Sequence, residues 1–148
     1  MTSQLVFIDV NIPMYAAGQP HAYKESCTWI MQEIASGQIS AVIDVEIVQE
    51  ILYRFGALKR WDLAISMAAA VLDIIPVVLP VTLVEARLSI LLFEQYARGG
   101  ITARDVIHTA VMQNNAIKEI ISTDEHFDKV DSLTRVDPLR LFESRQGP

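Results

Sequence analysis

The chain has 148 residues, of which 51% are apolar and 7% aromatic, so we expect one domain with an aliphatic core. Its 18 acidic and 12 basic side chains give a formal charge of −6, which argues against broad, nonspecific electrostatic binding of nucleic acid. A single cysteine, Cys27, excludes an internal disulfide, and no apolar stretch is long enough to span a bilayer. Because the N-terminus lacks the features of a signal peptide, we expect a cytoplasmic protein with no membrane segment.

The predicted elements alternate between strands and helices along the chain. Apolar runs typical of strands occupy residues 5–8, 39–43 and 119–122, while residues 76–80 predict a short edge strand or an extended connection and residues 134–136 a weaker strand. Segments with helical spacing or helix end signals occupy residues 24–35, 45–58, 61–75, 83–97 and 102–115. This alternation predicts an α/β fold with a central parallel sheet of four or five strands and helices on both faces. We expect a single domain over residues 1–148, with a core at about 4–138 and a short C-terminal tail.

Acidic residues follow several of the predicted strands at their carboxyl ends, among them Asp44 directly after residues 39–43. Asp9 comes directly after the first apolar run, and Asp124 follows the run that ends in Ser122 and Thr123, whose hydroxyls can orient the Asp124 carboxylate. Ligands of parallel sheets bind outside the carboxyl ends of the strands, so both acids are expected at one rim. Glu50 and Asp105 lie in predicted helices near this rim. The sequence therefore predicts an acidic pocket built from four distant parts of the chain.

An acidic pocket of this kind favours a divalent metal ion. Carboxylates forced together repel one another and persist only if they are protonated or if a cation lies between them. Oxygen-only ligands suit Mg²⁺ or Mn²⁺, whereas the cysteine and the three histidines show no spacing typical of zinc ligands. A hard ion held by Asp and Glu typically clamps phosphate oxygens and activates water for in-line attack. The predicted chemistry is hydrolysis of a phosphate ester.

Four stretches resemble, in order and spacing, the acidic motifs of PIN-domain nucleases, especially the small VapC-type toxins of toxin–antitoxin pairs: VFIDVNIPMY, DVEIVQEILYRF, ITARDVIHTAV and ISTDEHFDKV. The resemblance covers residues from about 6 to 138. It implies a metal-dependent endoribonuclease with an RNA substrate and a cognate antitoxin. The acids at the matching positions are Asp9, Glu50, Asp105 and Asp124, with Asp128 as an auxiliary acid and Asn11 and Thr123 as polar support. The surplus of apolar residues suggests a surface for a homodimer and for an inhibitor.

Several of these residues also have ordinary structural interpretations. Glu46 lies one helical turn before Glu50 and either can be the ligand, although Glu50 falls at the border of the apolar face and is favoured for that reason. Residues 102–105 resemble a capping box, which is an alternative role for Asp105. His108, one turn later, is interpreted as a packed or hydrogen-bonded helix histidine rather than a catalytic base.

Two other functions stay open from the sequence. A phosphatase would use Asp9 as a covalent nucleophile, but such enzymes favour a second aspartate two residues later, where this chain has Asn11. A non-catalytic module would use the acidic pocket to bind metal structurally or as a switch. Among nucleases, a housekeeping enzyme is an alternative to a toxin.

Overall fold

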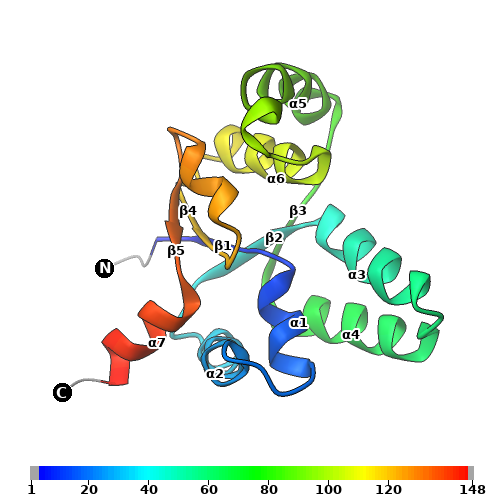
Figure 1. Cartoon of the computed structure of the whole chain (residues 1–148), viewed down its shortest axis with the longest axis vertical. Helices are drawn as coiled ribbons and strands as arrows, with labels where there is room; N and C mark the ends of the chain where they lie inside the picture. Colours follow the sequence, from blue (N-terminus) through cyan, green and yellow to red (C-terminus); the bar gives the residue numbers. More distant parts are fainter. Residues whose placement is uncertain (1–3, 147–148) are drawn as a thin grey trace.

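The computed structural model describes residues 4–146, and its centre is one sheet of five strands (Figure 1). The strands are β1 (Val6–Ile8), β2 (Ala41–Asp44), β3 (Val77–Leu79), β4 (Glu119–Ile121) and β5 (Thr134–Val136). Their order across the sheet is β3-β2-β1-β4-β5, and every neighbouring pair is parallel. The predicted parallel sheet is therefore confirmed.

The strand order changes direction at β1. The chain runs outward from β1 through β2 to β3 at one edge, then crosses to β4 on the other side of β1 and continues to β5. In an open parallel sheet, the ligand crevice lies at the carboxyl ends of the strands where the order reverses. The loops that follow β1 and β4, which carry Asp9 and residues 122–124, border this crevice.

Helices cover both faces of the sheet, as predicted (Figure 1). They are α1 (Asn11–Ala17), α2 (Lys24–Ala35), α3 (Val45–Ala57), α4 (Trp61–Ile74), α5 (Leu83–Tyr96), α6 (Ala103–Asn114) and α7 (Pro138–Gln146), with two 3₁₀ helices, η1 (Ala97–Gly99) and η2 (Glu125–Lys129). On one side α1 packs on α2, and on the other α5 packs on α6. Helices α3 and α4 form a hairpin that leads from β2 to β3.

Local signals in the sequence begin and end several helices. Thr102 forms a capping box with Asp105 at the start of α6. The Asp44 carboxylate caps α3 by accepting a hydrogen bond from the Ile47 amide at 3.2 Å. Gly37, just after α2, has a φ of 81°, a left-handed conformation that glycine adopts without steric cost. Asp44 and Thr102 fix where α3 and α6 start, and so where Glu50 and Asp105 lie.

The first and last helices are absent from the sequence prediction. Pro13 lies in the first turn of α1, where its missing N–H removes no intrahelical bond. Helix α7 begins at Pro138 and packs on α2, with the Trp29 and Phe142 ring centroids 5.6 Å apart in an edge-on contact. The segment expected as a short tail is therefore a helix docked on the domain.

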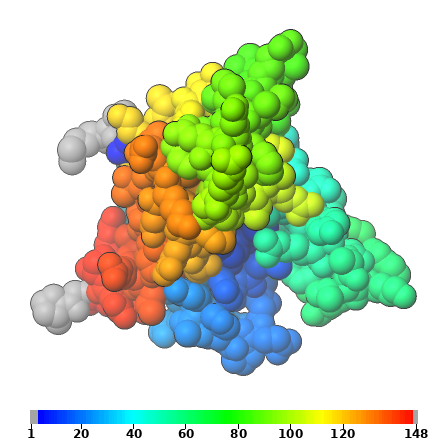
Figure 2. Space-filling model, turned by 45° about the horizontal axis from the view of Figure 1, so that its top comes forward, coloured from blue at the N-terminus to red at the C-terminus, as the bar shows by residue number. Residues whose placement is uncertain are grey.

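The core is aliphatic, as the composition predicts, and its fully buried aromatic side chains are Phe7 and Phe127. Exposed large apolar side chains gather on the α3–α4 hairpin and on α5, which project from the body as separate arms (Figure 2). They include Leu52, Leu58, Trp61, Ile65 and Leu72 on the hairpin and Leu83, Val84, Ile90, Leu91 and Phe93 on α5. Within residues 4–146, no helix is long and apolar enough to cross a lipid bilayer.

Candidate functional site

Asp9 comes directly after β1, at the edge of the sheet where the strand order reverses, and is only 4% exposed. Its Oδ1 accepts a hydrogen bond from the Val10 amide at 2.8 Å. Its Oδ2 accepts from the Ser122 hydroxyl at 2.6 Å and from the Asn11 amide group at 3.2 Å. These donors come from both sides of the crevice, and they hold the Asp9 carboxylate in one orientation.

The loop after β4 is tied to the loop after β1 by the same network. The Ser122 hydroxyl accepts a hydrogen bond from the Asp124 amide at 3.0 Å and donates to Asp9, so it orients Asp9 and not the Asp124 carboxylate, contrary to the sequence prediction. Thr123 contributes its backbone N–H, which donates to the Asn11 side-chain oxygen at 3.4 Å. Asn11 thus supports the Asp9 carboxylate with its amide nitrogen and the opposite loop with its oxygen.

Glu50 reaches the site from α3 and is held by a buried histidine. Its Oε1 lies 2.5 Å from His108 Nε2, and His108 Nδ1 lies 2.7 Å from Asp44 Oδ2. Because both partners are carboxylates, both ring nitrogens donate, and the imidazole carries a positive charge. Burial alone lowers the pKa of His108, but the hydrogen bonds to Asp44 and Glu50 outweigh burial and raise the pKa to about 10.

Asp105 and Asp124 form the outer half of the site. The Asp105 carboxylate accepts from the Thr102 amide at 3.3 Å, so its capping role and its place in the acidic site coexist. Burial raises the pKa of Asp105, and the neighbouring charge of Asp124 raises it further. Asp124 caps η2 by accepting from the His126 amide at 2.9 Å, and its Oδ1 lies 3.0 Å from His126 Nδ1.

The two halves form one electrostatic cluster. Possible ligand atoms of Asp9, Glu50 and His108 lie within 4.8 Å of one another, and the same holds for Asp105, Asp124 and His126. Burial raises the pKa of Asp9 to about 6, the His108 charge opposes this rise, and the charges of Asp105 and Glu50 add to it. Carboxylates from four separate segments therefore repel one another across a single crevice.

The free oxygens of this cluster suit a hard cation. Glu50 Oε2, Asp105 Oδ1 and Asp124 Oδ2 accept no hydrogen bond from the described part of the chain, and Arg54 lies 3.7 Å from Glu50 Oε2. Mg²⁺ and similar ions bind oxygen at about 2.0–2.1 Å in octahedral geometry, so ligand atoms around one ion lie roughly 3–4 Å apart. His108 is not a suitable ligand, because both of its ring nitrogens already donate to carboxylates. His126 can offer a nitrogen in the outer half of the site, but most of the donor atoms that the structure brings together are carboxylate oxygens, which suit a divalent cation.

The family model of the PIN domain matches residues 6–133. The chain belongs to the PIN-domain family. Ribonuclease VapC13 of Mycobacterium tuberculosis is 33% identical over 135 residues, which cover 89% of this chain and 99% of the relative. Ribonuclease VapC23 of the same species is 26% identical over 123 residues, which cover 81% of this chain and 93% of the relative.

Solved structures share the fold of this PIN domain. VapC20 of Mycobacterium tuberculosis, described as a sarcin–ricin loop cleaving toxin, has a TM-score of 0.70 and 16% identity, and the match covers 85% of this chain and 95% of that chain. VapBC2 of Rickettsia felis, bound to a DNA fragment from its promoter, has a TM-score of 0.69 and 13% identity, with 90% and 98% covered. At these identities the likeness establishes the fold.

Two further acids of this PIN domain lie outside the cluster. Glu46, the alternative to Glu50, is partly exposed and lies 3.9 Å from Arg104, whereas Glu50 is buried in the crevice. Asp128 forms a two-pronged ion pair with Arg135 at 2.9 and 3.1 Å, and it lines the same surface cavity as Asp124. A role for Asp128 as an auxiliary metal ligand stays a prediction.

The sequence interpretation missed the bridge from Asp44 through His108 to Glu50. It placed His108 correctly as a hydrogen-bonded helix histidine but named no partner for it. Two signals point to the bridge: Asp44 ends a buried strand, and His108 follows Asp105 by one helical turn on the same side of α6. A polar side chain buried at such a position needs a polar partner.

Proposed function

We propose that this PIN domain is a metal-dependent endoribonuclease that hydrolyses RNA phosphodiesters in the cytoplasm, as the toxin of a toxin–antitoxin pair. The observation that carries the proposal is that two neighbouring groups bring together carboxylates from four separate segments at the rim of the sheet, three of them buried. The names of VapC13 and VapC23, both ribonucleases, support RNA as the substrate.

In this proposal Asp9, Glu50, Asp105 and Asp124 are the catalytic acids and hold Mg²⁺ or Mn²⁺. When bound, such an ion polarises the phosphate and makes water a stronger nucleophile at neutral pH. The chain itself supplies the fixed positions of these ligands: Asn11 and Ser122 orient Asp9, and His108 anchors one oxygen of Glu50. Arg54, half exposed beside Glu50, offers a cation for the negatively charged phosphate of the substrate.

We further propose two protein partners. An enzyme that cuts cellular RNA must be restrained, and a cognate antitoxin is supported by the VapBC pair of Rickettsia felis among the structures of this fold. A second copy of the chain is supported by the exposed apolar side chains of α5, among them Ile90 at 70% and Leu91 at 62% exposure. Covering these side chains would remove a large apolar area from water.

The test is RNA cleavage by the purified chain after any copurifying partner has been removed by denaturation and refolding. We expect cleavage that requires Mg²⁺ or Mn²⁺, stops with a chelator and is lost in Asp9→Asn. The matched control is Asp131→Asn, an exposed aspartate outside the crevice, which should cleave like the wild type. A trapped aspartyl phosphate at Asp9 would indicate a phosphatase, and metal binding without turnover would indicate a non-catalytic module.

A further inference from the structure

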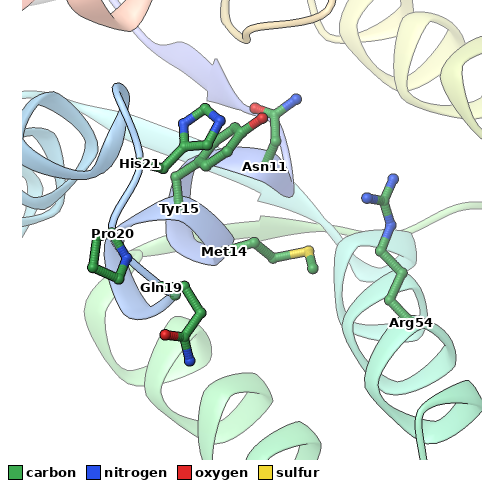
Figure 3. A pocket seen from close by; sticks show the side chains of 8 residues that line it. Asn11, Met14, Tyr15, Gln19, Pro20, His21 and Arg54 are labelled. Atoms are coloured by element: carbon green, nitrogen blue, oxygen red, sulfur yellow. The ribbon is translucent and has the colours of Figure 1, made fainter.

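A cavity of about 340 Å³ opens beside the acidic crevice, between α1, the loop that follows it, and α3 (Figure 3). Two of its lining residues belong to the candidate site. Asn11 donates to Asp9 at 3.2 Å, and Arg54 lies 3.7 Å from Glu50. A ligand in this cavity would therefore contact residues that touch two of the proposed metal ligands.

One wall of the cavity is a stack of rings. The ring centroids of Tyr15 and His21 lie 4.6 Å apart with an angle of 29° between the planes, and Figure 3 shows the imidazole lying over the phenol. Tyr23 contacts both rings, with its centroid 5.7 Å from His21 at an angle of 17° and 5.4 Å from Tyr15 at 45°, so the three rings support one another. The Tyr23 amide donates to His21 Nδ1 at 3.2 Å, which fixes the imidazole and leaves Nε2 as the proton-bearing nitrogen.

The opposite wall carries a positive charge. The Arg54 side chain extends from α3 toward the end of the cavity where Asn11 and the Tyr15 hydroxyl lie (Figure 3). The amide of Gln19 lies at the rim, and no carboxylate is among the lining side chains of the described residues. The cavity thus combines a flat aromatic surface, hydrogen-bonding amides and one cation. A planar uncharged ring attached to an anion matches this combination.

We propose that this cavity binds the nucleobase of an RNA nucleotide next to the phosphate that is cut, an inference that rests on the proposed nuclease function. The base stacks on the Tyr15 and His21 rings, and Arg54 contacts the adjoining phosphate. A cavity of about 340 Å³ is at the lower end of the range for small-ligand sites, roughly 300–1,000 Å³. Stacking also explains how a chain with a formal charge of −6 can hold RNA without a broad basic surface.

A second cavity, of about 440 Å³, lies between α1, α2 and α4 and supports the choice by contrast. Its lining is almost wholly apolar and includes Pro13, Met31, Leu63 and Met67. It offers neither an exposed ring stack nor a charged side chain among the described residues. Of these two cavities, the one beside Asn11 therefore has the chemistry that a nucleotide requires.

The test compares Tyr15→Ala and His21→Ala with the wild type on a short single-stranded RNA that contains one cleavage site. A second RNA lacks the base next to that site but keeps the backbone. We expect both variants to raise KM roughly tenfold on intact RNA with little change in kcat, because stacking on an aromatic side chain contributes to binding. On the abasic RNA the variants and the wild type should have the same KM.

Two further variants separate stacking from folding. Tyr15→Phe keeps the ring and should recover most of the affinity that Tyr15→Ala loses. Trp61→Ala is the matched control, because it removes an exposed aromatic side chain of α4 outside the cavity and should leave KM unchanged. Equal penalties on intact and abasic RNA would overturn the inference. A wild-type KM in both alanine variants would also overturn the inference. If these variants in addition escape inhibition by an antitoxin, the cavity binds the inhibitor and not a base.

The inference can fail while the nuclease function stands, and the two failures give different results. If the wild type cuts no RNA, the proposed function is wrong, and the cavity is then tested directly with a nucleoside 5′-monophosphate. Binding of this nucleotide is monitored through the NMR chemical shifts of residues 15–21. Binding by the wild type that is lost in Tyr15→Ala would support the base site. Absence of such binding by the wild type would overturn it.

Discussion

Replacing Asp9 with asparagine should stabilise the chain when no metal ion is present. Burial raises the pKa of Asp9 from 3.8 to about 6, so the folded chain holds the ionised carboxylate less favourably than the unfolded chain does. By the conversion of 1.36 kcal/mol per pKa unit, this corresponds to about 3 kcal/mol at neutral pH. The asparagine forms a weaker hydrogen bond with Ser122, which offsets about 1 kcal/mol of the gain. We expect a net gain of roughly 1–3 kcal/mol, or a Tm higher by on the order of 5 °C for a chain of this size.

The pH dependence of this gain has a definite sign. Below the unfolded pKa of 3.8, Asp9 is protonated in both states and the burial penalty is absent. As the pH rises through 3.8 to about 6, the unfolded chain ionises first, so the penalty grows and is complete above about 6. The difference between Asp9→Asn and the wild type should therefore be largest at pH 7–8 and nearly vanish by pH 4. Urea unfolding in a chelator, repeated across this range, measures it.

Adding Mg²⁺ or Mn²⁺ should reverse the order of stability, because an ion that binds only the folded state stabilises the wild type by mass action and the variant less. The exposed aspartate variant Asp131→Asn is the control and should match the wild type in both conditions. The reasoning is refuted if Asp9→Asn is no more stable than the wild type in chelator at pH 7.5, or if its gain is undiminished at pH 4.

Four other outcomes are expected. His108→Leu leaves two buried carboxylates without their cation and should lower the free energy of unfolding, measured in urea, by roughly 3–5 kcal/mol. The pKa of His108 is about 10, against 6.5 for the free side chain. This loss of stability should therefore be full below pH 6.5 and should fade as the pH rises through 10. Glu50→Gln should reduce RNA cleavage by more than the roughly 10–100-fold typical of residues that only support a ligand, while Glu46→Gln should stay near wild type. Equal losses in the two variants would contradict the choice of Glu50 over Glu46 as the ligand. Ile90→Asp should halve the mass measured by light scattering and leave the circular dichroism spectrum of the folded chain unchanged, since this side chain is 70% exposed in the single chain. Cys27 is fully buried and burial raises the pKa of its thiol to about 12, so iodoacetamide should label it only after unfolding, and rapid labelling of the native chain would be inconsistent with the fold.

The sheet was predictable because its strands are short apolar runs that end in acids, hydroxyls or proline. Such runs have one simple way to be buried, between two layers of helices, and this predicts the parallel order. Helix α1 was not predictable on the same grounds. It has seven residues, too few to be stable alone, and it forms because Ile12 and Pro13 are buried against the rest of the domain. Helix α7 likewise depends on its contact with α2.

The acids at strand ends were predictable for a topological reason, since parallel strands bring their carboxyl ends to one rim wherever their partners lie in the sequence. The bridge through His108 has no such rule behind it. Its Nε2 meets Glu50, 58 positions earlier, and its Nδ1 meets Asp44, 64 positions earlier. Both contacts depend on how α6 is rotated about its axis against α3 and β2, which packing decides and sequence spacing does not express. A buried cation next to a cluster of carboxylates has a physical consequence: the His108 charge opposes the repulsion among these carboxylates before any metal binds, while the remaining negative charge of the cluster attracts a cation.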